Sequence, residues 1–244
     1  VGTYTATISI TASGASNSPQ TVPVTLTVNP FAVGTGHYDF TYVDRASLLA
    51  AGWDFNAVQA SGAIRNTEQT TGAVVSYDQV AHPGALRIPV DVGDLWVGLN
   101  NTRNTLFRDL PSNWTSIRLK LSFAPTQNYQ QAGLVAYQDD DNYVQLTRIF
   151  ENGNYVTFAR EVQRGASIIS EVKQTATQGL VLRLDRELAT EKLTGYYSLD
   201  GVSWVSLGSV TQALNNPSLG IVVGASPGGY PNADMVWAEI VQSP

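Results

Sequence analysis

Hydrophobic and polar residues alternate along much of the chain, beginning at its N-terminus. In residues 4–10 and again in residues 22–28, apolar side chains occupy every second position and alternate mainly with Thr and Ser. A period of two residues is typical of β-strands that bury one face. The stretch between the two segments is rich in Ser, Gly, Asn and Pro, which predicts a loop. Residues 1–30 are therefore predicted to form a β-hairpin.

This predicted hairpin is too small to hold a hydrophobic core, because an isolated pair of strands is marginally stable in water. We therefore interpret residues 1–30 as the last hairpin of an upstream domain, followed by a linker at residues 31–37. Residues 38–244 are sufficient for one large domain. The sequence shows no signal peptide, so we expect the chain to be cut from a longer protein.

From Tyr38 onward, short apolar runs and alternating segments follow one another at close spacing, separated by turn motifs such as LDG and NNPS. Many short strands with frequent turns predict an all-β sandwich or barrel. One short helix is expected between Asp44, which suits an N-cap, and Gly52, which suits a C-terminal stop. The predicted strands are Leu86–Val90, Ser116–Phe123, Gly133–Gln138, Tyr143–Phe150, Val156–Val162, Leu180–Asp185, Thr194–Leu199, Leu219–Ala225 and Met235–Val241.

Three consecutive aspartates, Asp139 to Asp141, lie between two of these strands in the segment YQDDDNYVQL. Consecutive side chains at a strand end point in different directions, so three adjacent carboxylates do not face one ion unless the loop folds around it. An EF-hand loop needs acidic residues at alternate positions and a following glycine, and this segment has neither. We predict a solvated hairpin turn, with local calcium binding as the alternative.

Composition narrows the classes of function. The chain has no cysteine, which excludes disulfides and cysteine-ligated metals, and its net charge is −6 without any run of Lys or Arg. A nucleic-acid partner or an anionic membrane partner is therefore not expected. No apolar stretch approaches the roughly 20 residues of a membrane helix. Because only 14% of the residues are charged, the surface is expected to be rich in Ser, Thr, Asn and Gln.

Catalytic motifs are sparse. Glycosidases need two carboxylates about 5–9 Å apart across the sugar, and in sandwich-fold glucanases these acids alternate along one strand, a pattern that this sequence lacks. Its glutamates are scattered, mostly near strand ends, although distant carboxylates could still converge in space. His37 and His82 are interpreted as ordinary strand-end and loop residues. No G-x-S-x-G motif supports a serine nucleophile.

Aromatic and amide residues indicate a different chemistry. A sugar presents an apolar face ringed by hydroxyls, so its site needs a flat ring together with planar amide or guanidinium groups. Two segments, GDLWVGLNNTRNTLF and TQNYQQAGLVAY, carry both kinds. Trp96 and Tyr137 are the predicted stacking residues. The predicted hydrogen-bonding residues are Asn100, Asn101, Arg103, Gln131 and Arg148.

These assignments have structural alternatives. The rings could belong to the core, and the amides could cap turns. Arg148 continues the apolar alternation of Val144 and Leu146, which predicts a position at the floor of a groove. An ion pair with Glu161 at the sheet edge is the alternative for Arg148.

Three longer segments support a family resemblance: QQAGLVAYQDDDNYVQLTR, YYSLDGVSWVSLG and ADMVWAEI. They occur in this order in the concanavalin A-like, laminin-G-like sandwich domains that follow the catalytic unit in family 43 β-xylosidases and arabinofuranosidases. The chain from Tyr38 to Ser243 resembles this family. Residues 1–30, on the motif PVTLTV, resemble the closing strands of bacterial immunoglobulin-like modules of the BACON type.

The resemblance implies an all-β fold, a two-sheet antiparallel jelly-roll sandwich to which the N-terminal hairpin is an addition. It implies binding of a polysaccharide or oligosaccharide by a non-catalytic accessory module of a secreted bacterial protein, linked covalently to catalytic or immunoglobulin-like domains. It also implies a structural calcium ion held by Asp234 together with Asp39 or Asp44. A glycoside hydrolase or lyase and a ligand-free structural spacer are the alternative functions.

Overall fold

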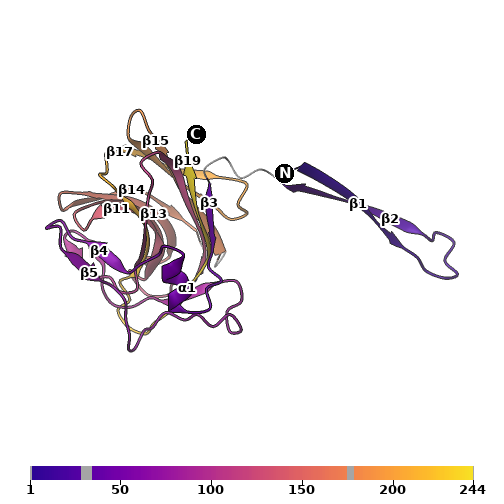
Figure 1. The fold of residues 1–244 in the computed structure, drawn as a ribbon, viewed down its shortest axis with the longest axis horizontal. Helices are drawn as coiled ribbons and strands as arrows, with labels where there is room; N and C mark the ends of the chain where they lie inside the picture. Colours follow the sequence, from indigo (N-terminus) through magenta and orange to yellow (C-terminus); the bar gives the residue numbers. More distant parts are fainter. Residues whose placement is uncertain (1, 29–34, 175–178, 244) are drawn as a thin grey trace.

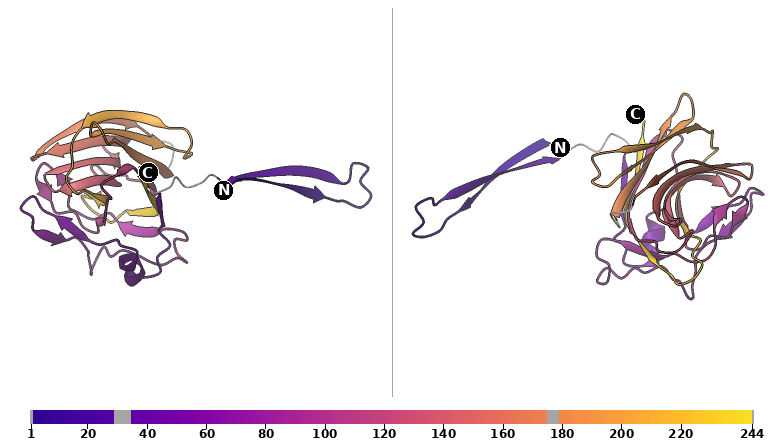
Figure 2. Two further views of the ribbon diagram at one scale, coloured as in Figure 1. Left: turned by 45° about the horizontal axis from the view of Figure 1, so that its top comes forward. Right: turned by 180° about the vertical axis from the view of Figure 1, so that it is seen from behind.

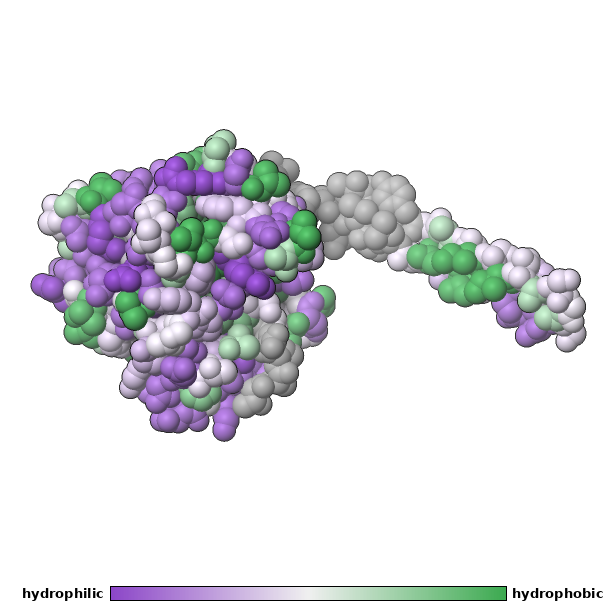
Figure 3. Space-filling model, turned by 90° about the horizontal axis from the view of Figure 1, so that it is seen from below, coloured by the Kyte–Doolittle hydropathy of each residue, from purple (hydrophilic) through white to green (hydrophobic). Residues whose placement is uncertain are grey.

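The N-terminal segment forms the predicted hairpin. The computed structural model describes residues 2–28, 35–174 and 179–243. Strands β1 (Gly2–Ile10) and β2 (Gln20–Val28) pair antiparallel along their whole length and are drawn apart from the rest of the chain (Figure 1). Hydrophobic side chains stay exposed on this hairpin (Figure 3): Ile8, Ile10, Val22 and Val24. The hairpin therefore does not bury its apolar face in the way that a packed strand pair does.

The predicted linker can be checked only at its end. Residues 31–34 lie outside the described residues, whereas Gly36 and His37 already belong to a strand, β3 (Gly36–Asp39). The sandwich therefore begins two residues before the predicted boundary at Tyr38.

Two antiparallel sheets form the sandwich in the described part of the chain (Figures 1 and 2). The first, which we call the back sheet, contains in spatial order β17 (Val205–Thr211), β16 (Lys192–Ser198), β15 (Gly179–Glu187), β10 (Trp114–Phe123), β19 (Asn232–Gln242) and β3, with β6 (Leu86–Pro89) pairing β19 beyond the end of β3. The second, the front sheet, contains β14 (Gly165–Lys173), β13 (Asn154–Val162), β12 (Asn142–Phe150), β11 (Gln131–Asp139), β18 (Ser218–Gly224) and β9 (Leu106–Asp109).

The core lies between the two sheets and follows the alternation of the sequence. On β12, Val144 and Leu146 are fully buried members of the main core cluster, together with Leu119 and Leu182 of the back sheet. Because successive side chains of a strand point to opposite faces, the residues between them point away from the core. We call this second face of the front sheet its outer face. The two-sheet antiparallel sandwich that the sequence indicated is thus confirmed.

The predicted helix is also confirmed. Helix α1 (Arg45–Ala50) begins after Asp44, whose carboxylate accepts a hydrogen bond of 2.7 Å from the backbone N–H of Ser47, and Ser47 returns the interaction as a capping box. Gly52 has a φ of +85°, the left-handed conformation expected of a residue just past a helix end. In the described residues, no helix is long and apolar enough to cross a lipid bilayer.

The three aspartates form the predicted hairpin turn between β11 and β12. Asp139 accepts hydrogen bonds of 2.9 Å from the backbone of Asp141 and the side chain of Asn142. Asp140 accepts from the backbone of Ala60, and Asp141 lies 3.6 Å from Arg164. Each carboxylate therefore has its own partner, as the divergence of consecutive side chains requires.

The remaining elements were not predicted from the alternation. They are β3, β9, β14, β17 and two small hairpins, β4 (Asn56–Val58) with β5 (Ile64–Asn66), and β7 (Leu95–Trp96) with β8 (Leu99–Asn100). Strands β14 and β17 lie at sheet edges. An edge strand is partly exposed on both faces, so its sequence alternates weakly.

Candidate functional site

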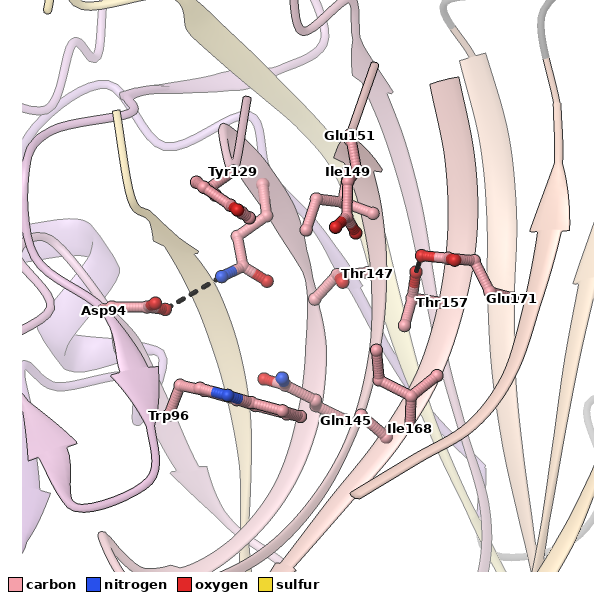
Figure 4. Close-up of a pocket in the computed structure, with 12 residues that line it drawn as sticks. Asp94, Trp96, Tyr129, Gln145, Thr147, Ile149, Glu151, Thr157, Ile168 and Glu171 are labelled. Atoms are coloured by element: carbon pink, nitrogen blue, oxygen red, sulfur yellow. Dashed lines mark hydrogen bonds between the residues drawn. The ribbon is translucent and has the colours of Figure 1, made fainter. Parts of the chain in front are cut away.

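The outer face of the front sheet is covered at one end and open at the other. Hairpins β4–β5 and β7–β8 cover part of it and seal a second apolar cluster composed of Ala57, Leu95, Phe107, Val135, Tyr137, Tyr143 and Val222. The uncovered part forms a pocket of about 410 Å³ (Figure 4). A volume of this size suits a small ligand or a few residues of a longer one.

The floor of the pocket comes from the centre of the sheet and its walls from loops. Gln131, Gln145, Thr147 and Thr157 project from β11, β12 and β13. One wall carries Asp94 and Trp96 at the β7 hairpin, and Figure 4 shows them across the pocket from the residues of β13 and β14. The remaining lining residues are Tyr129, Ile149, Glu151, Ala159, Ile168 and Glu171.

Gln145 has an unusual environment for a buried amide. Only 4% of the residue is exposed, and its Oε1 has no hydrogen-bond partner within the described residues. In Figure 4 its side chain lies beside Trp96. A buried polar atom without a partner costs about 1–3 kcal/mol, so such atoms are rare in folded proteins. A ligand in the pocket would supply the missing partner.

The other polar side chains of the pocket are held in place by neighbours. The Gln131 amide donates a 2.9 Å hydrogen bond to Asp94, and the Thr157 hydroxyl lies 3.2 Å from the Glu171 carboxylate. Burial raises the pKa of the Asp94 carboxyl and the charge of Glu161 adds to the rise, against hydrogen bonds from Leu95 and Gln131 that lower it. The pocket is thus partly shielded from water at the Asp94 wall.

The wall that carries Trp96 is anchored by a buried carboxylate. Glu161 on β13 is fully buried, and it accepts hydrogen bonds of 2.7 Å from the backbone N–H of Val97 and 3.0 Å from that of Gly98. The Tyr143 hydroxyl lies 2.7 Å from the same carboxylate. Burial, with the hydrogen bond and charge of Glu161, raises the pKa of Tyr143, so the phenol stays protonated and can donate. Two backbone N–H groups and the Tyr143 hydroxyl, which also lies 2.8 Å from the carbonyl of Leu95, therefore surround Glu161 beneath the hairpin turn.

Val97 occupies a strained position in that turn. Val97 and Gly98 have φ angles of +48° and +73° and connect the paired strands β7 and β8, the conformation of a type I′ hairpin turn. A β-branched residue is disfavoured at positive φ, and the Val97 side chain is 56% exposed. We expect Val97→Gly to raise the free energy of unfolding by about 0.5–1 kcal/mol, because the relief of strain exceeds the added flexibility of the unfolded chain. Denaturant titration measures this change.

The control for that substitution is Val80→Gly. Val80 is 93% exposed and does not have a positive φ, so glycine there only adds flexibility to the unfolded chain and should lower stability slightly. Equal changes in the two variants would contradict the strain at Val97.

Two of the seven predicted binding residues line the pocket, Trp96 and Gln131. Tyr137 does not: it is 2% exposed, its ring packs against Phe107, and its hydroxyl donates a 2.7 Å hydrogen bond to the carbonyl of Val58. The prediction that Tyr137 stacks on a sugar is therefore wrong. The cause is the β4–β5 hairpin, which covers this part of the outer face.

Asn100, Asn101 and Arg103 also point elsewhere. The Asn100 amide donates to the hydroxyl of Tyr137 and accepts from an arginine, Arg65. Asn101 accepts from the backbone N–H that precedes β7, and Arg103 forms a 3.0 Å ion pair with a buried aspartate, Asp91. Each of the three side chains is engaged by another part of the chain and none lines the pocket, so the structure does not place them at the proposed binding site.

Arg148 lies on the opposite side of the front sheet from the pocket. It is 2% exposed, shares the core-facing side of β12 with Val144 and Leu146, and donates to the backbone carbonyl of Gln174. The apolar alternation correctly predicted that Arg148 shares a face of β12 with Val144 and Leu146. That face, however, points into the core, whereas the pocket lies on the outer face. The alternative ion pair with Glu161 is also absent from the described residues, because Glu161 points to the outer face.

The aspartates predicted to hold calcium are not brought together. Both carboxylate oxygens of Asp234 accept from Arg87, at 2.7 and 2.8 Å. Asp39 lies 3.1 Å from His37 and pairs with Trp237, which is about 10 Å along β19 from Asp234 at 3.3 Å per residue. Asp44 caps α1. Among the described residues, no group of three or more potential metal-binding side chains is assembled, so calcium stays a prediction without a donor set.

Sequence reasoning missed most of the pocket floor. Gln145 and Thr147 alternate with Val144 and Leu146, and polar residues opposite an apolar face usually indicate a solvated surface. Here the loops around them turn that surface into a pocket. Acidic residues far apart in the sequence also converge on its rim: Asp94, Glu151 and Glu171.

The family model described as "Beta xylosidase C-terminal Concanavalin A-like domain", GH43_C2, matches residues 67–225. The chain belongs to this family. The match includes β11 to β14 of the front sheet and all the residues that line the pocket.

Solved structures agree with the fold of this GH43 C-terminal domain. The GH43 protein BlXynB from Bacillus licheniformis aligns with a TM-score of 0.58 at 23% identity, over 67% of this chain and 34% of that one. A xylan β-1,4-xylosidase from Bacillus halodurans aligns with a TM-score of 0.67 at 16% identity, over 91% and 42%. A functionally unknown protein from Saccharomyces cerevisiae aligns with a TM-score of 0.57 at 13% identity, over 72% and 96%.

The GH43 C-terminal domain described here spans less than half of the two Bacillus proteins. At these identities the likeness concerns the fold. No curated protein matches the chain significantly.

Proposed function

We propose that this domain binds a carbohydrate in the pocket on the outer face of its front sheet and does not cleave it. The observation that carries the proposal is the buried amide of Gln145, whose oxygen has no partner in the described residues although it lies in an open pocket beside Trp96. An indole ring next to an amide oxygen without a partner suits a sugar, which combines an apolar ring face with hydroxyl donors.

The remaining pocket residues support this ligand class. Gln131 and Thr147 offer further planar or hydroxyl groups on the floor, and Ile149 and Ile168 add apolar surface. The sandwich belongs to a family named for its place in β-xylosidases. An open pocket that orders a flexible chain is expected to bind modestly, with a Kd of about 10 μM to 1 mM, or roughly −4 to −7 kcal/mol.

A glycoside hydrolase is the second candidate, because three carboxylates reach the pocket: Asp94, Glu151 and Glu171. Cleavage needs a proton donor and a base or nucleophile on either side of one bond. Asp94 accepts hydrogen bonds from Gln131 and from the backbone of Leu95 on the same oxygen, Oδ1, so one of its two oxygens is engaged in holding the wall. Release of reducing ends from a bound polysaccharide would favour the hydrolase; retention without release favours the binding module.

The experiment is affinity electrophoresis against arabinoxylan, xyloglucan, galactomannan and mixed-linkage β-glucan. Trp96→Ala is expected to weaken retention by about tenfold or more, since it removes the aromatic wall. The matched control is Trp204→Ala, because Trp204 is half-buried beside Arg183 and lies outside the pocket. Loss of retention in both variants, or in neither, would contradict the assigned site. If the wild-type domain is retained by no polysaccharide, the ligand-free spacer is the better description.

Gln145 gives a second, independent variant. Gln145→Leu keeps the volume of the side chain and removes the buried unpartnered amide. The substitution should leave the free domain as stable or more stable and should weaken polysaccharide retention. A variant that is less stable and binds normally would show that the amide has a structural partner instead of a ligand.

The cellular context remains part of the proposal. We propose a secreted bacterial protein in which this domain is linked covalently to catalytic or immunoglobulin-like domains. The exposed apolar residues of the β1–β2 hairpin support an upstream module, because that face has no packing partner among the described residues. Sequencing the whole gene would test both statements.

A further inference from the structure

The pocket has an unbalanced set of charges. In the part of the chain that the structure describes, its ionisable lining residues apart from Tyr129 are Asp94, Glu151 and Glu171, and neither arginine, lysine nor histidine lines it. The three acids come from different places, the β7 hairpin, the turn between β12 and β13, and strand β14. Lys173, two residues beyond Glu171 on β14, is exposed and does not belong to the lining.

Within the described ranges, none of these acids is paired with a base, unlike several other carboxylates of the domain. Several carboxylates elsewhere pair with arginines, as in Asp91–Arg103, Asp234–Arg87 and Glu191–Arg186, whereas Glu161 and Asp139 are buried among neutral donors and do not line the pocket. No ion pair joins Asp94, Glu151 or Glu171 to a base in the described residues. Their protein partners are neutral, an amide for Asp94 and a hydroxyl for Glu171. The negative charge of the pocket is therefore not neutralised by the protein.

Carboxylates also restrict which polar groups can bind beside them. An ionised carboxylate only accepts hydrogen bonds. The hydroxyls of an uncharged sugar can donate to it, whereas the carboxylate of a uronate or the sulfate of a sulfate ester offers only acceptor oxygens at its position and brings a like charge. Such repulsion is strengthened where water is partly excluded, as it is around the half-buried Asp94.

We infer that the pocket selects uncharged glycans and rejects glycans that carry carboxylate or sulfate groups. This inference rests on the proposed function and names its substrate class. The charges of Asp94, Glu151 and Glu171 act as the selecting element, while Trp96 and the amides of the floor supply the attraction.

The test compares three forms of each of the four polysaccharides named above: unmodified, partially acetylated and partially sulfated to the same degree. Acetylation blocks hydroxyls without adding charge, so it controls for bulk. We expect sulfated chains to bind at least about tenfold more weakly than acetylated ones at low salt, with the gap narrowing as NaCl is raised, because salt screens exposed charges.

Variants assign the effect to the pocket. In the double variant Glu151→Gln/Glu171→Gln, the factor by which acetylated chains bind more tightly than sulfated chains should become smaller. Glu187→Gln removes one exposed charge outside the pocket and should leave that ratio unchanged. Sulfated chains that bind as well as acetylated ones, or better, would overturn the inference and leave the proposed function intact. Failure of all three forms to bind would overturn the proposed function itself.

Discussion

Replacing Gly133 with alanine is expected to lower the free energy of unfolding by about 3 kcal/mol or more. Gly133 lies in β11, a strand paired on both sides, opposite Thr147 of β12 and Val222 of β18. A methyl group there would overlap the backbone carbonyl oxygen of Leu146 and would lie 2.7 Å from the Cα of Thr147. Backbone atoms in the centre of a sheet cannot move aside without breaking the ladder, so this substitution belongs at the upper end of overpacking costs. Chemical denaturation measures the change.

The matched control is Gly228→Ala in the loop between β18 and β19. No heavy atom lies within 4 Å of the position that its Cβ would occupy, and its φ is not in the left-handed region. Its stability should stay within about 0.5 kcal/mol of the wild type. If Gly133→Ala proves equally harmless, the close approach of β11 to β12 is not a feature of the molecule.

The long central strands could be predicted from the sequence because each buries one face continuously. Strands β10, β12 and β19 keep their alternation over most of their length. The structure begins each of them one to three residues before the predicted start, and only β19 extends past the predicted end, by one residue. The short helix could also be predicted, because the residues that determine its ends, Asp44 and Gly52, lie within one turn of it in the sequence. What these elements share is that the determining contacts lie close in the sequence.

The candidate site was harder to predict, since its composition depends on contacts between distant segments. Trp96 was found because an aromatic residue beside polar ones is informative by itself. Tyr137 has the same local appearance, and only the β4–β5 hairpin, some 80 residues earlier, decides that it is covered. For Arg148, alternation gave the correct face, but it does not say which of the two faces of a sheet becomes the core.

The clustering of the three pocket acids could not be predicted from the sequence either. Asp94, Glu151 and Glu171 have no common motif, and their convergence follows from sheet order and loop placement. A search for alternating acids along one strand cannot detect such a group. The scattered positions of the glutamates in the sequence therefore do not exclude a shared acidic site. The possibility that distant carboxylates converge in space was left open, and the fold realises it for these three.

Glu161→Leu is expected to cost about 3–5 kcal/mol of stability and to abolish polysaccharide binding. The substitution removes the shared acceptor of the partly buried backbone N–H groups of Val97 and Gly98, and it leaves the Tyr143 hydroxyl only the carbonyl of Leu95, at 2.8 Å. Donors that lose their acceptor in a partly buried site carry a desolvation penalty, and the apolar side chain cannot replace a buried charged acceptor. Because the same turn carries the Trp96 wall, the ring should lose its fixed position. Denaturation monitored by tryptophan fluorescence, together with affinity electrophoresis, measures both effects.

A graded series separates anchoring of the wall from general destabilisation. Glu161→Gln keeps one carbonyl acceptor and should cost less than the leucine variant, about 1–2 kcal/mol, and Tyr143→Phe removes one donor and should cost about as much. If Glu161 positions the wall, binding should weaken in Glu161→Gln at temperatures where the variant is fully folded, and weaken less in Tyr143→Phe, which keeps both backbone hydrogen bonds to the turn. Normal affinity in a folded Glu161→Gln domain would mean that the turn holds Trp96 without its buried acceptor, and the carboxylate would then matter for stability alone.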